Sequence, residues 1–145
     1  MSNKFFEKVG GRPALEKINK IFYDKVYADP WLSLYFTQVS QEHIESQQTD
    51  FLQSSFGGKK VYCGRLPLGA HQHVFITEEL YALRSSLLKE SLEEYGLAED
   101  LIDHWMNIDA AFKSVMIKKS VEDCKPRFKT DPIVNIPNPA MKKTG

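Results

Sequence analysis

Apolar side chains recur along this chain at intervals of three and four residues, and this spacing strongly limits the folds available to it. After Pro13, four apolar residues fall on one helical face: Leu15, Ile18, Phe22 and Val26. Proline suits the first position of a helix, and the Asp-Pro pair that follows Ala28 ends it, because a residue before proline avoids the α region. No segment alternates convincingly as a half-buried strand would. The sequence therefore predicts an all-α fold.

The same spacing predicts three further helices. One runs from about residue 40 to residue 56, with a stripe formed by Ile44, Gln47 or Gln48, Phe51 and Ser55. The next begins after Thr77, a good N-cap residue followed by two acidic residues, and stops at Gly96. The last runs from about residue 99 to residue 118, and its apolar stripe is clear.

Length and composition indicate one helical domain and exclude several classes of partner. The 145 residues suit a domain over residues 1–118 and a Pro-rich tail over residues 119–145 that is disordered or loosely docked. The net charge is zero, so no electrostatic footprint for nucleic acid stands out. No apolar run approaches the roughly 18 residues of a membrane-spanning helix, and the N-terminus carries no apolar leader. We therefore expect a soluble, cytoplasmic protein with no membrane partner.

The stretch GAHQHVFIT, at residues 69–77, holds two of the four histidines. On a helix, His71 shares a face with three apolar neighbours: Leu68, Val74 and Phe75. His73 points roughly 200° away from that face. His71 is therefore the better candidate to face an apolar interior, either as a satisfied core histidine or as the ligand of a bound group. Together with Cys63 the two histidines have no recognised zinc spacing, and no nucleotide-binding or hydrolase motif is present.

Several segments of the sequence, taken in order, resemble the truncated haemoglobins. VGGRPALEKINKIFYDKVYADPWLSLYF is similar to the opening of that family, with a double glycine, a helix ending in Phe-Tyr, then Asp-Pro and an aromatic pair. QQTDFLQSSFGGKKVYCG resembles the next block, and AHQHVFIT resembles the proximal block, in which Ile-Thr follows five residues after histidine. The resemblance covers about residues 3–118, and the spacing between blocks is most like that of the first subgroup.

The resemblance implies a two-over-two helical sandwich around a b-type haem. His71 falls on the proximal position that ligates the iron, in agreement with the face argument. Tyr23 and Gln48 fall on the distal positions that stabilise a bound ligand. The remaining positions that surround the haem are Phe36, Ile44, Gln47, Phe51, Leu52, Tyr62 and Phe75.

The resemblance also implies small haem ligands. We expect reversible dioxygen binding and reaction with nitric oxide, which as an enzymatic dioxygenation needs an electron-donating reductase. A hydrogen-bond donor in a low-dielectric pocket stabilises the negative charge that dioxygen acquires, so Tyr23 and Gln48 favour slow release. Two other hypotheses stay open: a carrier, store or sensor without turnover, and a haem-free helical interaction module. A helical adaptor unrelated to globins is a more remote one.

The chain also departs from the family pattern. Pro67 stands where a methionine is often found before the proximal histidine. Gln47 occupies the position from which one family member supplies a second histidine to the iron, so we expect no bis-histidine ligation. Arg84 lies on a side where the family has an apolar residue or tryptophan, and it reaches either a propionate or solvent. Lys60, Tyr62 and Arg65 are candidates for the propionates or for a solvated loop.

Overall fold

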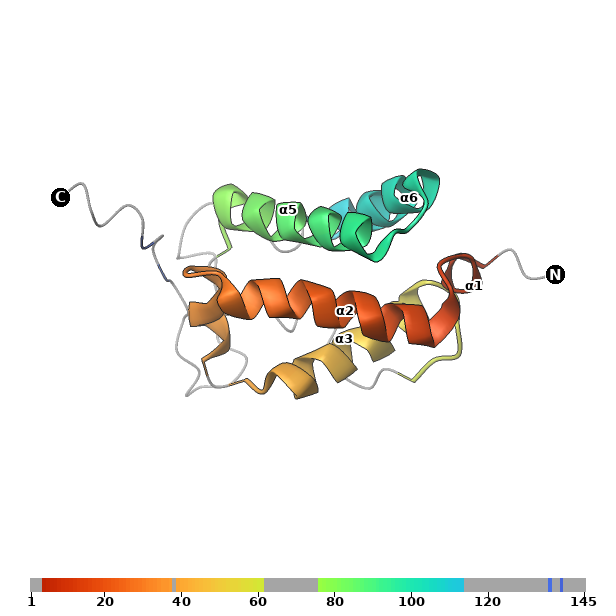
Figure 1. Cartoon of the computed structure of the whole chain (residues 1–145), viewed down its shortest axis with the longest axis horizontal. Coiled ribbons are helices and arrows are strands. Elements are labelled where there is room, and N and C mark those ends of the chain that lie inside the picture. Colours follow the sequence, from red (N-terminus) through yellow and green to blue (C-terminus); the bar gives the residue numbers. More distant parts are fainter. Residues whose placement is uncertain (1–3, 38, 62–75, 114–135, 137–138, 140–145) are drawn as a thin grey trace.

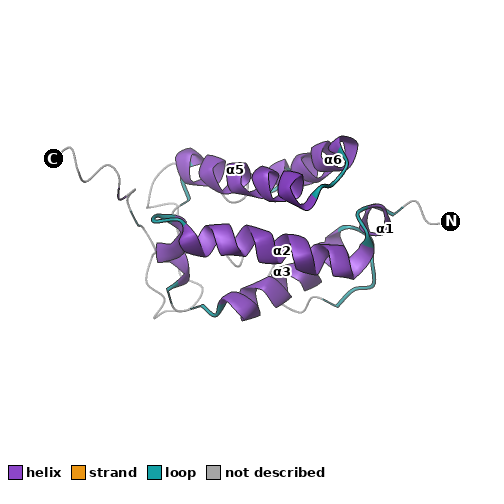
Figure 2. Ribbon diagram, in the orientation of Figure 1, coloured by secondary structure: helices purple, strands orange, loops and turns teal. Residues whose placement is uncertain are grey.

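The computed structural model describes residues 4–37, 39–61, 76–113, 136 and 139. Its elements along the chain are the following helices: α1 (Phe5–Lys8), α2 (Gly11–Ala28), the 3₁₀ helix η1 (Leu32–Phe36), α3 (Gln41–Ser55), α5 (Glu78–Tyr95) and α6 (Glu99–Ala110). The part of the chain that the structure describes contains no strand, as Figure 2 shows. The predicted all-α fold is therefore confirmed.

The four long helices form two layers. In Figure 1, α2 runs through the middle of the molecule, with α3 on one side and the pair α5 and α6 on the other. Helix α2 packs against both α3 and α5, and α5 packs against α6. This is the predicted two-over-two sandwich, in which α2 and α3 form one layer and α5 and α6 form the other.

The helix ends follow from residues that the sequence analysis singled out. The Ser40 hydroxyl accepts the backbone N–H of His43 at the start of α3, and the Thr77 hydroxyl accepts the N–H of Leu80 at the start of α5. Gly96 ends α5 in the left-handed conformation, as predicted. Asp29 leaves α2 with extended backbone, and its carboxylate accepts two backbone N–H groups at the start of η1.

The double glycine has a steric role at the start of α2. Gly10 and Gly11 have φ angles of 112° and 70°, a region that residues with a side chain rarely adopt. A Cβ atom on Gly10 would also lie 2.9 Å from the Cβ of Ala14. The pair lets the chain turn sharply from α1 into α2. The sequence analysis did not predict α1, which is only one turn long.

The core lies along α2. All four residues of its predicted stripe are buried, together with Tyr23. In α3 the buried face differs from the predicted one, because Thr49, Leu52 and Gln53 are buried while Ile44, Gln48 and Phe51 are half-buried. The Asn19 amide donates a hydrogen bond of 2.8 Å to the Thr49 hydroxyl, which explains how two polar side chains can lie between α2 and α3.

Helix α6 is shorter than the sequence predicted. It ends at Ala110, and the residues after 113 to which the prediction extended lie outside the described part. Ile102 and Trp105 of the predicted stripe are buried. Further along the chain, the carbonyl of Ile136 accepts hydrogen bonds from the Trp31 indole at 2.7 Å and from the Tyr35 hydroxyl at 3.1 Å.

Candidate functional site

The centre of the candidate site is Tyr23 on α2. Its side chain is 7% exposed, and its hydroxyl has no hydrogen-bond partner among the described residues. Burial raises the pKa of Tyr23 to about 12, so the phenol keeps its proton at neutral pH. A buried hydroxyl without a partner costs free energy. Tyr23 is therefore a protonated donor with no acceptor in the part of the chain that the structure describes.

Two aromatic rings lie next to the ring of Tyr23. The rings of Phe22 and Tyr23 meet edge to face with centroids 4.9 Å apart, and the ring of Phe36 at the end of η1 lies 6.2 Å from that of Tyr23. Tyr27 also contacts Phe36, at 5.5 Å, but its hydroxyl donates to the carbonyl of Val39. The corner formed by α2 and η1 thus brings the predicted Tyr23 and Phe36 together.

Helix α3 carries a second row of predicted site residues. Ile44, Gln48 and Phe51 recur at spacings of four and three, share one face, and are half-buried. Their exposure distinguishes the two glutamines that the sequence left as alternatives, because Gln47 is exposed and Gln48 is half-buried. Leu52 is buried and belongs to the core.

A charged cluster that the sequence analysis missed lies between α5 and α6. The Arg84 guanidinium donates to both carboxylate oxygens of Asp109 at 2.7 Å. The Tyr81 hydroxyl donates to the same carboxylate at 3.0 Å and to the Asp109 carbonyl at 2.8 Å. Burial, followed by the Asp109 charge, raises the pKa of Tyr81 to about 12. Arg84 therefore does have a protein partner, which is neither of the alternatives that the sequence left open.

The sequence did hold a signal for this cluster. Arg84 stands four residues from both Leu80 and Leu88, which are buried on α5. A guanidinium on an apolar face requires a counter-charge, because burying an unpaired charge is costly. The sequence could not show which acid supplies it.

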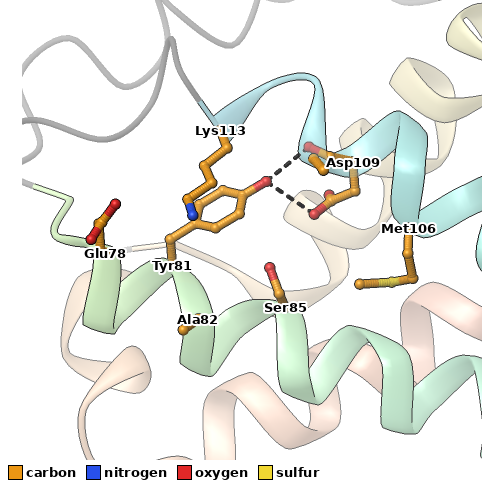
Figure 3. A pocket seen from close by; sticks show the side chains of 8 residues that line it. Glu78, Tyr81, Ala82, Ser85, Met106, Asp109 and Lys113 are labelled. Atoms are coloured by element: carbon orange, nitrogen blue, oxygen red, sulfur yellow. Dashed lines mark hydrogen bonds between the residues drawn. The ribbon is translucent and has the colours of Figure 1, made fainter.

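A cavity of about 250 Å³ opens beside this cluster, between α5 and α6. Figure 3 shows Tyr81 reaching from α5 to Asp109 on α6, with Ser85 and Met106 further along the lining. The Tyr81 and Asp109 side chains occupy one wall of the cavity, so the wall nearest the ion pair is polar.

Three residues of the predicted site lie outside the described part of the chain: Tyr62, His71 and Phe75. His73 and Arg65 lie outside it as well, while Lys60 is described and exposed. The proximal ligand therefore stays a prediction. The two other histidines, His43 and His104, are both exposed.

Comparison with known proteins decides the family. A family model of bacterial-like globins matches residues 4–118 of the chain. The chain belongs to this family. The group 1 truncated haemoglobin of Tetrahymena thermophila is 33% identical over 97 residues, which cover 67% of this chain and 80% of that protein. The group 1 truncated haemoglobin of a Synechocystis species is also 33% identical, over 102 residues that cover 67% and 82% of the two proteins.

Solved haemoglobin structures share this fold. The Fe(III) form of truncated haemoglobin from Tetrahymena pyriformis matches with a TM-score of 0.75 and 27% identity, covering 81% of this chain and 100% of that one. The two-over-two haemoglobin of a Synechococcus species, solved with covalently attached haem, matches with a TM-score of 0.70 and 27% identity over 83% and 94% of the chains. The resemblance to group 1 truncated haemoglobins is confirmed.

Globins bind haem, and the described residues of this globin are compatible with a haem pocket. Tyr23 offers a buried donor with no acceptor among the described residues, Phe36 packs beside its ring, and Ile44 and Phe51 on α3 pack against the same core. Apolar walls with one or two convergent polar groups are typical of a cofactor pocket. In the described residues, no helix combines the length and the apolar composition needed to cross a bilayer.

Proposed function

We propose that this globin holds a b-type haem through His71 and binds dioxygen reversibly on the side of Tyr23. The observation that supports the proposal is the buried Tyr23 hydroxyl, which has no acceptor among the described residues. The haem iron, when bound, supplies an open coordination position for a small ligand. The remaining site residues that we assign to the pocket are Phe36, Ile44, Gln47, Gln48, Phe51, Leu52, Tyr62 and Phe75.

The chain's own residues orient the ligand and exclude water. Tyr23 donates a hydrogen bond to the ligand from α2, and Gln48 donates a second from α3. A hydrogen bond in a pocket of low dielectric is stronger than one in water, and dioxygen attracts it because it gains negative charge on binding. Phe22 and Phe36 keep water from competing for the same hydroxyl.

We further propose that the bound dioxygen reacts with nitric oxide in the cytoplasm. Conversion of dioxygen and nitric oxide to nitrate consumes one electron per turnover, so this activity requires an external electron-donating reductase. The two convergent donors favour slow dioxygen release, which suits such a reaction better than delivery. A carrier, store or sensor would use the same pocket without turnover.

The decisive test is the absorption spectrum of the purified protein and of two variants. We expect a Soret band in the wild type and in His73→Ala, and its loss or weakening in His71→Ala. The reverse result for the two histidines would overturn the assignment of His71, rather than His73, as the iron ligand. Absence of a Soret band from the wild type after haem reconstitution would instead support the haem-free interaction module.

A further inference from the structure

Arg84 lies on the face of α5 that packs against the rest of the molecule. Its side chain is 22% exposed, and that of its partner Asp109 is 11% exposed. Removing two charges from water carries a desolvation cost, and well-packed apolar residues of similar volume are often at least as stabilising. Stability alone therefore gives little reason for an ion pair at this position.

The two ends of the ion pair lie in different surroundings. The guanidinium carbon of Arg84 lies 5.7 Å from the centroid of the Phe22 ring and 5.5 Å from that of Tyr81. The Asp109 carboxylate, on α6, accepts a hydrogen bond from the Tyr81 hydroxyl, on α5. Phe22 is the ring in edge-to-face contact with Tyr23. One aromatic ring therefore bridges the positive end of the pair and the Tyr23 side chain.

The electrostatic effects on Tyr23 agree with this geometry. Burial is the largest cause of its raised pKa, the Arg84 charge opposes it, and the Asp109 charge adds to it with a smaller effect than that of Arg84. Of the two charges in the pair, that of Arg84 therefore has the larger effect on the pKa of Tyr23. Burial would lower the pKa of Arg84, but the Asp109 charge and hydrogen bond raise it, so the guanidinium stays charged.

We propose that the Arg84–Asp109 pair makes the distal side of the haem site selective for small anionic ligands, because its positive end lies against Phe22, the ring that contacts Tyr23. A fixed charge in a buried site acts over several ångströms with little screening. Asp109 holds the guanidinium in one orientation through two hydrogen bonds. This inference rests on the proposed haem function.

The test measures the binding of azide to the ferric protein in four forms: wild type, Arg84→Met, Asp109→Asn and the double variant. Removing Arg84 leaves the negative carboxylate, so azide affinity falls about tenfold. Removing the Asp109 charge leaves the guanidinium, so affinity rises. The double variant contains neither charge and lies between wild type and Arg84→Met. It also leaves no unpaired buried charge, so it tests the proposal if a single variant fails to fold.

A second measurement separates an electrostatic role from a structural one. In the ferrous carbonyl form, positive potential near the ligand weakens the C–O bond and lowers its stretching frequency. We expect the frequency to rise in Arg84→Met and to fall in Asp109→Asn. Arg12→Met is the matched control, because Arg12 also forms ion pairs but precedes Tyr23 by eleven residues, or about 16 Å along α2.

The outcomes are distinguishable. Opposite shifts in Arg84→Met and Asp109→Asn, with none in Arg12→Met, would support the proposal. Shifts of the same sign in both variants, or none in either, would overturn it while leaving haem binding intact. A wild-type protein without a Soret band would overturn the proposed function and this inference with it.

Discussion

At the scale of single residues, the site depends on which hydrogen-bond partners the hydroxyl groups of Tyr23 and Tyr27 have. The two tyrosines lie one turn apart on α2, and both contact Phe36. The Tyr27 hydroxyl has a carbonyl partner, whereas the Tyr23 hydroxyl has none among the described residues. Tyr23 is therefore the one placed to donate to a bound ligand, and Tyr27 is a natural control for it.

We predict that Tyr23→Phe speeds dioxygen release. Hydrogen bonds to charged groups contribute about 1.5–3 kcal/mol, so the dissociation rate measured by stopped flow should rise by roughly ten- to a hundredfold. Tyr27→Phe should leave the rate unchanged, because its hydroxyl points to Val39. Equal dissociation rates in wild type and Tyr23→Phe would refute a donor role for Tyr23.

The sequence predicted single residues well where helical spacing determines them. The buried stripe of α2, and Thr77 and Gly96 at the ends of α5, follow from local rules and are confirmed. The partner of Arg84 does not follow from such rules. Asp109 meets Arg84 only because α6 packs against α5 at one particular register, which no local pattern records.

At the scale of elements, the contact between α2 and α3 determines how the distal residues approach each other. The Asn19–Thr49 hydrogen bond lies inside this contact, with both side chains 2% exposed. Asn19 stands one turn before Tyr23, and Thr49 follows Gln48. Spacing predicted α3, but it placed the inward face on the apolar stripe. A polar pair was missed because it becomes acceptable in the core only once both helices are present.

We predict that breaking this pair loosens the contact measurably. Asn19→Ala leaves the Thr49 hydroxyl without its donor and should lower the free energy of unfolding by about 1–3 kcal/mol, measured by denaturant titration. Thr49→Val should cost a similar amount. The double variant should cost less than the sum, since the two residues share one hydrogen bond. Additive costs would mean that the pair does not stabilise the contact.

At the scale of the whole molecule, one residue far along the chain joins the helical sandwich at the aromatic corner. Ile136 packs against the core, and its carbonyl accepts hydrogen bonds from Trp31 and Tyr35, about a hundred residues earlier. Trp31 directly precedes η1, and Tyr35 lies within it, next to Phe36. The sequence predicted that this Pro-rich region is a disordered or loosely docked tail, and it could not indicate the contact of Ile136, because neither periodicity nor a motif marks that residue.

We predict that Trp31→Phe releases this attachment while Trp105→Phe does not. Both tryptophans are buried, so each variant loses packing, but only Trp31 donates to Ile136. Trp105 instead packs edge to face against Phe5 and Phe56. Under native conditions, tryptic cleavage at Lys129 and Lys142, on either side of Ile136, should be faster in Trp31→Phe, followed by mass spectrometry. Local opening depends on the contacts that hold a segment, so loss of the Ile136 contact should speed cleavage in Trp31→Phe only. Equal acceleration in both variants would mean that cleavage reports general destabilisation.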